Sequence, residues 1–170
     1  KLIRLRLNME DPSVDYSAND IKHFQATQWG QLHSDSCLLD IFPLPSPKAS
    51  DWHYDTWSDM PILQSRQSYK SALRESRISS LRDKIEKFKP SVVHFYGMDR
   101  EYVEIWEAVA QLSFNSETRH LTYKNKHCFI AQNAETAFVV TYQPNAVWNN
   151  AYWNNAGKLV HQFQLSNSNH

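Results

Sequence analysis

Residues 138–159, FVVTYQPNAVWNNAYWNNAGKL, contain the transition that decides the fold. The apolar, β-branched run at residues 138–141 predicts a buried strand, which stops at the polar turn of residues 142–145. A helical pattern follows, so the chain passes from a strand through a short turn into a helix. Open α/β sheets bind ligands at such transitions, because polar side chains and free N–H groups meet at the carboxyl end of the strand.

Toward the N-terminus, apolar runs and helical patterns alternate in the same way. Residues 2–7 alternate apolar and basic side chains and fit either an edge strand or a helix end. A polar cluster beginning at Ser17 predicts the start of a short helix that ends near Gly30, and residues 44–61 form a long loop rich in Pro, Ser, Asp and Trp. The remaining pattern predicts strands at residues 37–42, 91–96, 119–123, 128–132 and 138–142, and helices at residues 66–88, 99–112 and 149–163.

This order of elements predicts a single α/β domain over residues 1–170. Strands that alternate with helices are typical of a mostly parallel central sheet between helical layers, which is a three-layer α/β/α sandwich. One helix shows its inner face by periodicity, because apolar side chains recur at helical spacing and are expected to face the core: Ile78, Leu81, Ile85 and Phe88.

Composition narrows the class of protein. The chain has 170 residues, of which 41% are hydrophobic and 21% charged, enough to bury a core. Lys and Arg number 18 and so do Asp and Glu, so the balance implies no attraction of the whole surface to nucleic acid or membrane. No apolar run approaches the roughly 20 residues that cross a bilayer, and no signal peptide is recognised. We therefore expect a cytoplasmic protein without a membrane partner.

Gly, His and Cys usage limits the chemistry further. With 3 Gly, the chain has neither the dinucleotide fingerprint nor a P-loop, and we expect no cofactor. The 8 His form no metal pattern, so we expect no metal site, and His94 is expected in the core with a satisfied ring nitrogen. Cys37 and Cys128 lie in apolar runs, which favours two buried free thiols, and a disulfide between them is the alternative that the sequence leaves open.

Three segments carry a resemblance to a known family. Residues 37–47 read CLLDIFPLPSP, residues 89–97 read KPSVVHFYG after a long helix, and residues 139–145 read VVTYQPN. In this order they resemble the strand-then-Pro segment, the central strand and the closing motif of the uracil-DNA glycosylase superfamily. The similarity covers roughly residues 37–160. It implies a glycosylase-like fold, DNA or a nucleobase as the partner, and N-glycosylase activity, which is a hydrolysis.

The sequence also departs from the pattern of that superfamily. The first motif, which supplies a water-activating acid or amide, has no counterpart, and residues 1–7 are at best a remnant of its strand. Asp40 stands where the superfamily commonly has a base-reading Asn. In the closing motif, Gln143 stands for His and Asn145 for Ser, and only Pro144 matches.

Asp40 and Gln143 are the candidate catalytic residues that the resemblance implies. The Gln143 amide is a neutral donor that can hold a carbonyl oxygen but stabilises a departing base anion less well than His. Losing one such donor costs ~10²–10³ in rate. The Asp40 carboxylate either accepts hydrogen bonds from an amino-bearing base edge or binds a nearby backbone N–H or Arg.

Five further residues are candidates for binding the substrate. Trp52 is either a base-stacking platform or part of a loop pinned to the core by its aromatic side chains. Tyr96 either lines the pocket or fills the core, and Asn145 either belongs to the site or caps a helix. Phe42 ends the first matching strand. Trp148 opens the last helix, where the superfamily inserts a side chain into the duplex.

Three functions remain open at this point. The chain is a glycosylase-like enzyme acting on a damaged or modified base, a catalytically inactive relative that binds nucleic acid, a nucleotide or a protein, or another small α/β enzyme. The enzyme needs a deep pocket where Asp40, Gln143 and an N-terminal acid converge. A partner-binding relative would instead have that pocket filled by aromatic side chains and an apolar patch elsewhere. The oligomeric state is not determined by the sequence.

Overall fold

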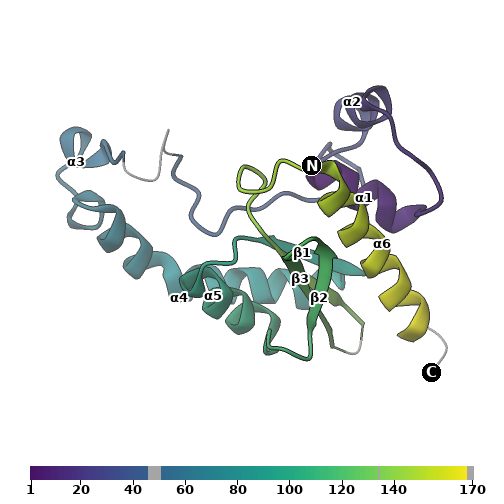
Figure 1. Cartoon of the computed structure of the whole chain (residues 1–170). Helices are drawn as coiled ribbons and strands as arrows, with labels where there is room; N and C mark the ends of the chain where they lie inside the picture. Colours follow the sequence, from purple (N-terminus) through teal and green to yellow (C-terminus); the bar gives the residue numbers. More distant parts are fainter. Residues whose placement is uncertain (46–50, 134, 168–170) are drawn as a thin grey trace. The chain divides into compact units, whose positions relative to one another are not determined.

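The computed structural model of the chain describes residues 1–45, 51–133 and 135–167 (Figure 1). The chain divides into two compact units, which we call the sheet unit, Lys1–Cys37 with Lys89–His170, and the helical unit, Leu38–Phe88. The single domain expected over residues 1–170 stays a prediction, since two such units can belong to one domain.

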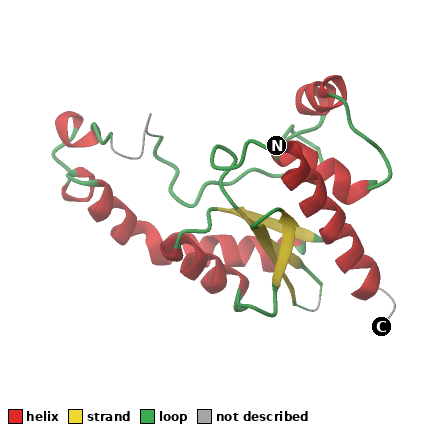
Figure 2. Ribbon diagram, viewed as in Figure 1, coloured by secondary structure: helices red, strands yellow, loops and turns green. Residues whose placement is uncertain are grey.

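The described residues form six α-helices, one 3₁₀ helix and four strands, which confirms the α/β class (Figure 2). The sheet unit contains α1 (Leu2–Glu10), α2 (Ala18–Thr27), β1 (Val92–Tyr96), α5 (Arg100–Ala110), β2 (Arg119–Tyr123), β3 (Lys126–Gln132), β4 (Ala137–Thr141) and α6 (Asn150–Asn167). The helical unit contains α3 (Tyr54–Trp57), the 3₁₀ helix η1 (Pro61–Leu63) and α4 (Arg66–Phe88).

The sheet is mixed, with the strand order β1-β4-β3-β2. β1 and β4 pair in parallel, whereas β3 pairs antiparallel with both β4 and β2. The expectation of a mostly parallel sheet is therefore wrong. The reason is loop length: only Lys124 and Asn125 separate β2 from β3, and a parallel crossover needs about a dozen residues or more. The three-layer sandwich stays a prediction.

Both faces of the sheet pack against helices of the sheet unit. On one face, Trp106 of α5 stacks on Phe95 of β1, with ring centroids 4.7 Å apart, and Phe95 stacks in turn on Phe138. On the other face, one buried cluster joins β3 and β4 to α6 and α1: Leu5, Cys128, Ile130, Val139, Val147, Tyr152, Trp153, Ala156 and Val160. β4 lies between α5 on one face and the buried cluster with α6 and α1 on the other, and all five of its residues are buried.

Residues 2–7, whose pattern fits a strand or a helix, belong to helix α1. Its two sides are both covered: Leu2 and Leu5 pack in the α6 cluster, while Ile3 and Leu7 pack on Phe24 of α2. Because apolar side chains face two directions, the helix shows strand-like alternation in sequence. Figure 1 shows α1 and α6 side by side.

Two local features determine where the helices α1, α6 and α2 lie or begin. A Cβ on Gly157 of α6 would collide with the backbone oxygen of Leu5 and lie 2.8 Å from the Cβ of Asn8, so α1 and α6 meet at van der Waals distance only because Gly is there. Ser17 and Asp20 form a capping box at the start of α2, which confirms the predicted helix start.

The helical unit differs from its prediction in one element. Residues 37–42, expected as a strand, form no regular structure. Leu38 and Leu39 are 56% and 49% exposed, and no described strand pairs with this run. Instead, Arg77 of α4 donates to the backbone oxygens of Asp40 and Ile41. Without a neighbouring strand to satisfy its backbone, an apolar run does not become a strand.

The other elements of the helical unit follow the prediction more closely. Helix α4 has the predicted bounds, but only Tyr69 and Ile78 are buried, and Phe88, expected in the core, is 70% exposed. The long loop contains α3 and ends at η1, and its residues 46–50 lie outside the described ranges. In the described residues, no helix combines the length and hydropathy of a membrane span.

The two cysteines are both free thiols, but only Cys128 is buried. Cys37 is exposed, so the expectation of a second buried thiol is wrong. The cause is the same as for residues 37–42: the apolar run to which Cys37 belongs forms no strand and enters no core. Burial raises the pKa of the Cys128 thiol to about 12, which keeps it protonated and unreactive.

Candidate functional site

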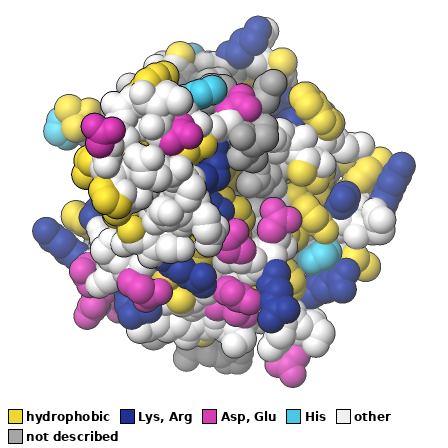
Figure 3. Space-filling model, turned by 90° about the vertical axis from the view of Figure 1, so that its left-hand side faces the viewer, with side chains coloured by type: hydrophobic (Ala, Val, Ile, Leu, Met, Phe, Trp, Pro, Cys, Tyr) yellow, Lys and Arg dark blue, Asp and Glu magenta, His cyan; other side chains and the backbone are white. Residues whose placement is uncertain are grey.

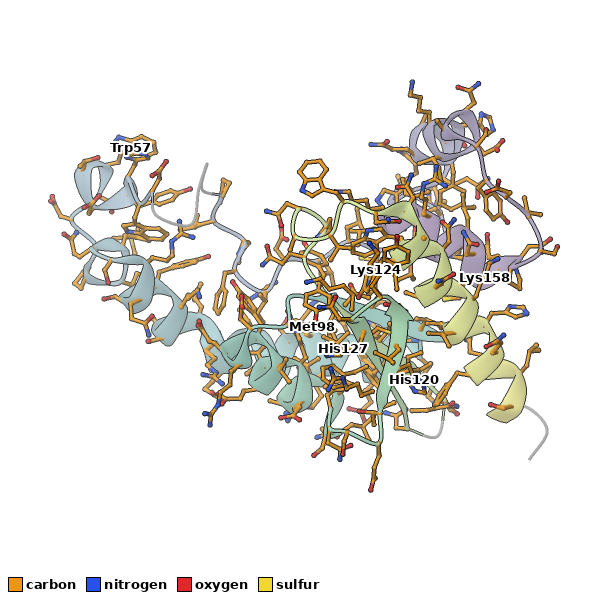
Figure 4. All side chains as sticks on the ribbon, in the orientation of Figure 1. Trp57, Met98, His120, Lys124, His127 and Lys158 are labelled. Carbon is orange, nitrogen blue, oxygen red and sulfur yellow. The ribbon has the colours of Figure 1, made fainter. Side chains whose placement is uncertain are left out.

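A cavity of about 490 Å³ lies in the sheet unit, between α5, β3 and the end of β4. Three kinds of side chain line it: aromatic, charged and aliphatic. They are Met98, Arg100, Val103, Glu104, Glu107, His127, Phe129 and Tyr142. Figure 4 labels Met98 and His127, which lie near each other on the wall of this cavity. The site therefore combines ring surfaces with hydrogen-bonding groups of both signs.

Parallel pairing places this cavity at the carboxyl ends of β1 and β4. Because the two strands run in parallel, the turns that follow them meet at one edge, and the N–H of Gly97 donates to the oxygen of Thr141 at 2.8 Å. Gly97 has φ +114°, a backbone conformation that favours Gly. The Trp106 ring N–H donates to the Gly97 oxygen at 3.1 Å, which anchors the turn to α5.

The contact of Arg119 with the His127 ring favours one tautomer. Arg119 Nη2 lies 3.3 Å and the Tyr142 hydroxyl 3.4 Å from its Nδ1. Since guanidinium nitrogens only donate, Nδ1 accepts and the neutral ring carries its proton on Nε2. Desolvation, with the positive charges of Arg119 and Lys126, lowers the pKa of His127, so the neutral form is favoured at neutral pH.

Rings form a rigid wall behind His127. Its ring centroid lies 5.2 Å from that of Phe129 and 5.6 Å from that of Tyr142, both edge to face. Lys126 Nζ lies 4.6 Å from the centroid of Tyr142. Tyr152 of α6 donates its hydroxyl to the His127 backbone oxygen at 2.9 Å, and burial raises its pKa, so it stays a donor.

Acidic side chains of α5 form the opposite wall. Glu107 Oε1 accepts the backbone N–H of Phe114 at 2.8 Å, which fixes the carboxylate. Glu104 pairs with Arg100 at 3.0 Å near the mouth, where both side chains are exposed. The exposed pair contributes little to stability, whereas the anchored Glu107 carboxylate is a defined acceptor.

Four of the predicted site residues lie in the sheet unit. Gln143 follows Tyr142, and its Nε2 lies 3.7 Å from where a Cβ on Gly97 would be, so the two motif ends meet. Tyr96, at the end of β1, is 40% exposed, and Asn145 is exposed. Trp148 is 79% exposed, with Lys1 Nζ 3.9 Å from the centroid of its ring.

The other three predicted residues, Asp40, Phe42 and Trp52, lie in the helical unit. Asp40 is exposed, and Arg77 Nη2 donates to its backbone oxygen at 2.5 Å rather than to its carboxylate. Phe42 contacts Tyr69 edge to face at 6.2 Å.

Trp52 is anchored by neighbours of its own unit. Its ring N–H donates to the Leu63 oxygen at 2.7 Å, and its ring lies 5.4 Å from that of Tyr69 and 4.8 Å from that of Tyr54. These contacts favour the pinned loop over the stacking platform.

None of the seven predicted residues is among the described side chains that line the cavity. Sequence reasoning missed its acidic wall, although the signal was present: Arg100, Val103, Glu104 and Glu107 recur at helical spacing on one flank of α5. It also dismissed His127 for lacking a metal pattern. Within residues 1–45, 51–133 and 135–167, no group of three or more His, Cys, Asp or Glu is placed to hold a metal.

His94, which the sequence places in the core, is only partly buried in β1. Its Nε2 is 2.7 Å from Thr141 Oγ1, across the parallel pair β1 and β4, so a ring nitrogen is satisfied as expected. Desolvation lowers the pKa of His94 to about 4, and the ring is neutral at physiological pH.

Comparison with protein-family models, curated proteins and solved structures finds no match to the chain.

Proposed function

We propose that this protein is a nucleobase-binding module, related to the uracil-DNA glycosylase superfamily but without its hydrolytic chemistry. The observation that carries the proposal is the open cavity of the sheet unit, which is lined by aromatic rings, His127 and the anchored carboxylate of Glu107. Proteins hold an extruded base in this way, by stacking its face and bonding its edge. The proposal includes the three-layer α/β/α sandwich of that superfamily as the fold of this chain.

Two segments of the chain support the part of the proposal that excludes hydrolysis of a glycosidic bond. Residues 2–10 form a helix, so the described chain has no strand there to present the water-activating residue of the first motif. Residues 37–42 form no strand either, and the Asp40 side chain is exposed. Hydrolysis of a glycosidic bond needs a positioned water and a stabilised base anion, and these segments would have to supply part of both.

A binding experiment tests the module. Fluorescently labelled single-stranded DNA and RNA would be titrated with the full chain, using wild type, Tyr142→Leu and the control Tyr123→Leu. Tyr142 lines the cavity, whereas Tyr123 lies on the β2–β3 hairpin outside it. Because stacking on an aromatic ring is worth about 1–3 kcal/mol per base, we expect Tyr142→Leu to bind about 5- to 150-fold more weakly. No binding by wild type, or equal loss in both variants, would reject the proposal.

A second candidate function, glycosylase activity, is favoured by Gln143. Its amide lies beside Gly97, where the two motif segments meet, and it is a donor that could hold a base carbonyl. The test is alkali cleavage of oligonucleotides that carry one uracil or hypoxanthine after incubation with the protein. An abasic product that Gln143→Ala abolishes would establish the enzyme and contradict an inactive module.

A further inference from the structure

Glu107 has hydrogen-bonding capacity beyond the bond that holds it. A carboxylate has about four lone-pair sites, and the Phe114 N–H occupies one of them, on Oε1. Glu107 lies in the last turn of α5, and the C-cap residue Gln111, which follows the helix, has the left-handed conformation with φ 57°. The turn that follows brings Phe114 back to the carboxylate, so the acceptor is held in place before any ligand arrives.

The two polar walls of the cavity differ in what they can bind. His127 of β3, with its proton on Nε2, is a hydrogen-bond donor, and Arg100, the first residue of α5, offers several more donors. The carboxylate of Glu107 offers only acceptors. A ligand that bonds all of these groups presents N–H groups to Glu107 and a carbonyl oxygen or ring nitrogen to His127 or Arg100.

We infer that the base recognised by this cavity is guanine, or a base with the same donor edge, an inference that rests on the proposed function. Guanine places two adjacent donors, N1–H and the 2-amino group, where one carboxylate can accept both. Its O6 and N7 are acceptors, and Arg commonly binds them.

The other bases do not satisfy the hydrogen-bonding groups on both sides of the cavity. Uracil and thymine flank their single N–H with two carbonyl oxygens, which a carboxylate repels. Adenine and cytosine have one amino group beside a ring nitrogen acceptor, so they satisfy half of the Glu107 carboxylate. A polar group that the bound ligand covers and leaves without a partner is costly, and such a mismatch discriminates strongly between ligands.

The same chemistry serves a free guanine nucleotide and a guanine in single-stranded nucleic acid. The chain has equal numbers of acidic and basic residues, 18 of each, and on the face shown in Figure 3 both kinds are interspersed. The balance of charge provides no general attraction to phosphates, so the base edge has to provide the selectivity.

Isothermal titration of the full chain tests the inference with GMP, IMP, AMP, CMP and UMP as ligands. IMP is the matched ligand, because it lacks only the 2-amino group of GMP. We expect GMP to bind at least about tenfold more tightly than IMP and than the other three nucleotides. A second arm uses an oligothymidine with one central guanosine, against oligothymidine alone, to separate nucleic acid from free nucleotide as the source of the base.

Two variants separate recognition from folding. Glu107→Gln keeps Oε1 as the acceptor for Phe114 but removes the charge and one acceptor, so the preference for GMP over IMP should fall to about twofold or less. Glu101→Gln, on an exposed position of the same helix outside the cavity, should keep the wild-type preference. Circular dichroism of both variants checks that α5 is intact.

The outcomes separate this inference from the proposed function. Binding of all bases with similar affinity, or a preference for another base, would overturn guanine recognition and leave the binding module standing. A preference that Glu107→Gln does not change would equally overturn the role of Glu107. No binding of any nucleotide or oligonucleotide would reject the module itself.

Discussion

The sheet unit and the helical unit contain similar apolar runs and treat them differently. Residues 138–141 and residues 38–42 are both rich in apolar side chains, and a Pro follows each run closely. The first run lies in β4 between β1 and β3 and is buried, whereas the second has no described strand beside it and leaves Leu38 and Leu39 about half exposed. Apolar composition thus becomes a strand where neighbouring strands accept its backbone bonds.

The helices of the two units repeat the contrast. Helix α5 has 11 residues and buries Ile105, Trp106, Val109 and Ala110. Helix α4 has 23 residues and buries only Tyr69 and Ile78. We therefore expect the free energy of unfolding to depend far more on the sheet unit, and we expect substitutions to show it.

The largest expected effect compares Val139→Asp with Leu39→Asp. Val139 is fully buried between two strands, so a carboxylate there has no partner and should cost more than about 4 kcal/mol, enough to unfold most of the protein. Leu39 is half exposed, and its replacement should cost about 0.5 kcal/mol or less. Urea unfolding followed by circular dichroism measures both. Equal losses would show that residues 38–42 are buried as deeply as β4.

The next effect is a pH dependence of the sheet unit. In the folded chain the pKa of His94 is lowered to about 4, from 6.5 in the unfolded chain. The unfolded state therefore binds a proton between these values that the folded state does not, and stability falls as pH drops from 6.5 toward 4. The loss attributable to His94 should approach about 3 kcal/mol.

Unfolding free energies of wild type and His94→Gln at several pH values measure this contribution. The variant removes the titrating group, so its stability should fall less over the same range. His53→Gln, at an exposed position of the helical unit, is the control for replacing a histidine by glutamine. A His94→Gln curve parallel to wild type would show that His94 is as well solvated in the folded state as in the unfolded one.

The smallest expected effect comes from a helix cap in the sheet unit. Ser17 accepts the backbone N–H of Asp20, and Asp20 bonds back to the N–H of Ser17. Ser17→Ala should cost about 1 kcal/mol, measured as a lower urea midpoint. Thr56→Ala, in the short helix α3 of the helical unit, should change the midpoint less, because no side-chain cap holds that helix. The opposite order would place more stability in the helical unit than its burial indicates.

Periodicity predicted helices α2, α4, α5 and α6 and the four strands of the sheet, but it left α1 open between strand and helix and did not predict α3 or η1. Helix α4, the start of α2 and the four strands of the sheet all follow from local patterns in the sequence. The direction of strand pairing was not predicted, because it depends on the lengths of the connecting loops and not only on the order of the elements. The strand at residues 37–42 failed for a non-local reason, the lack of a neighbouring strand.

The predicted site at the carboxyl end of β4 stays a prediction, and none of its seven residues lines the cavity. Polar groups at the carboxyl end of β4 were expected, and the cavity begins there, at Tyr142. Its acidic wall comes from the flank of α5, and His127 comes from an antiparallel strand whose position depends on the sheet order. Residues brought together by tertiary packing leave only weak signals in a single sequence.

The contact of α1 with α6 at Gly157 bears on the order in which the chain is made. The ribosome releases α1 first among the described helices and α6 last. At about 5–20 residues per second, roughly 7–30 s of synthesis separate them. Phe24 of α2 can cover Ile3 and Leu7 early in that interval, whereas Leu5 waits for the α6 cluster. During translation, the side of α1 that carries Leu5 is thus the surface on which a nascent-chain chaperone would be expected to act.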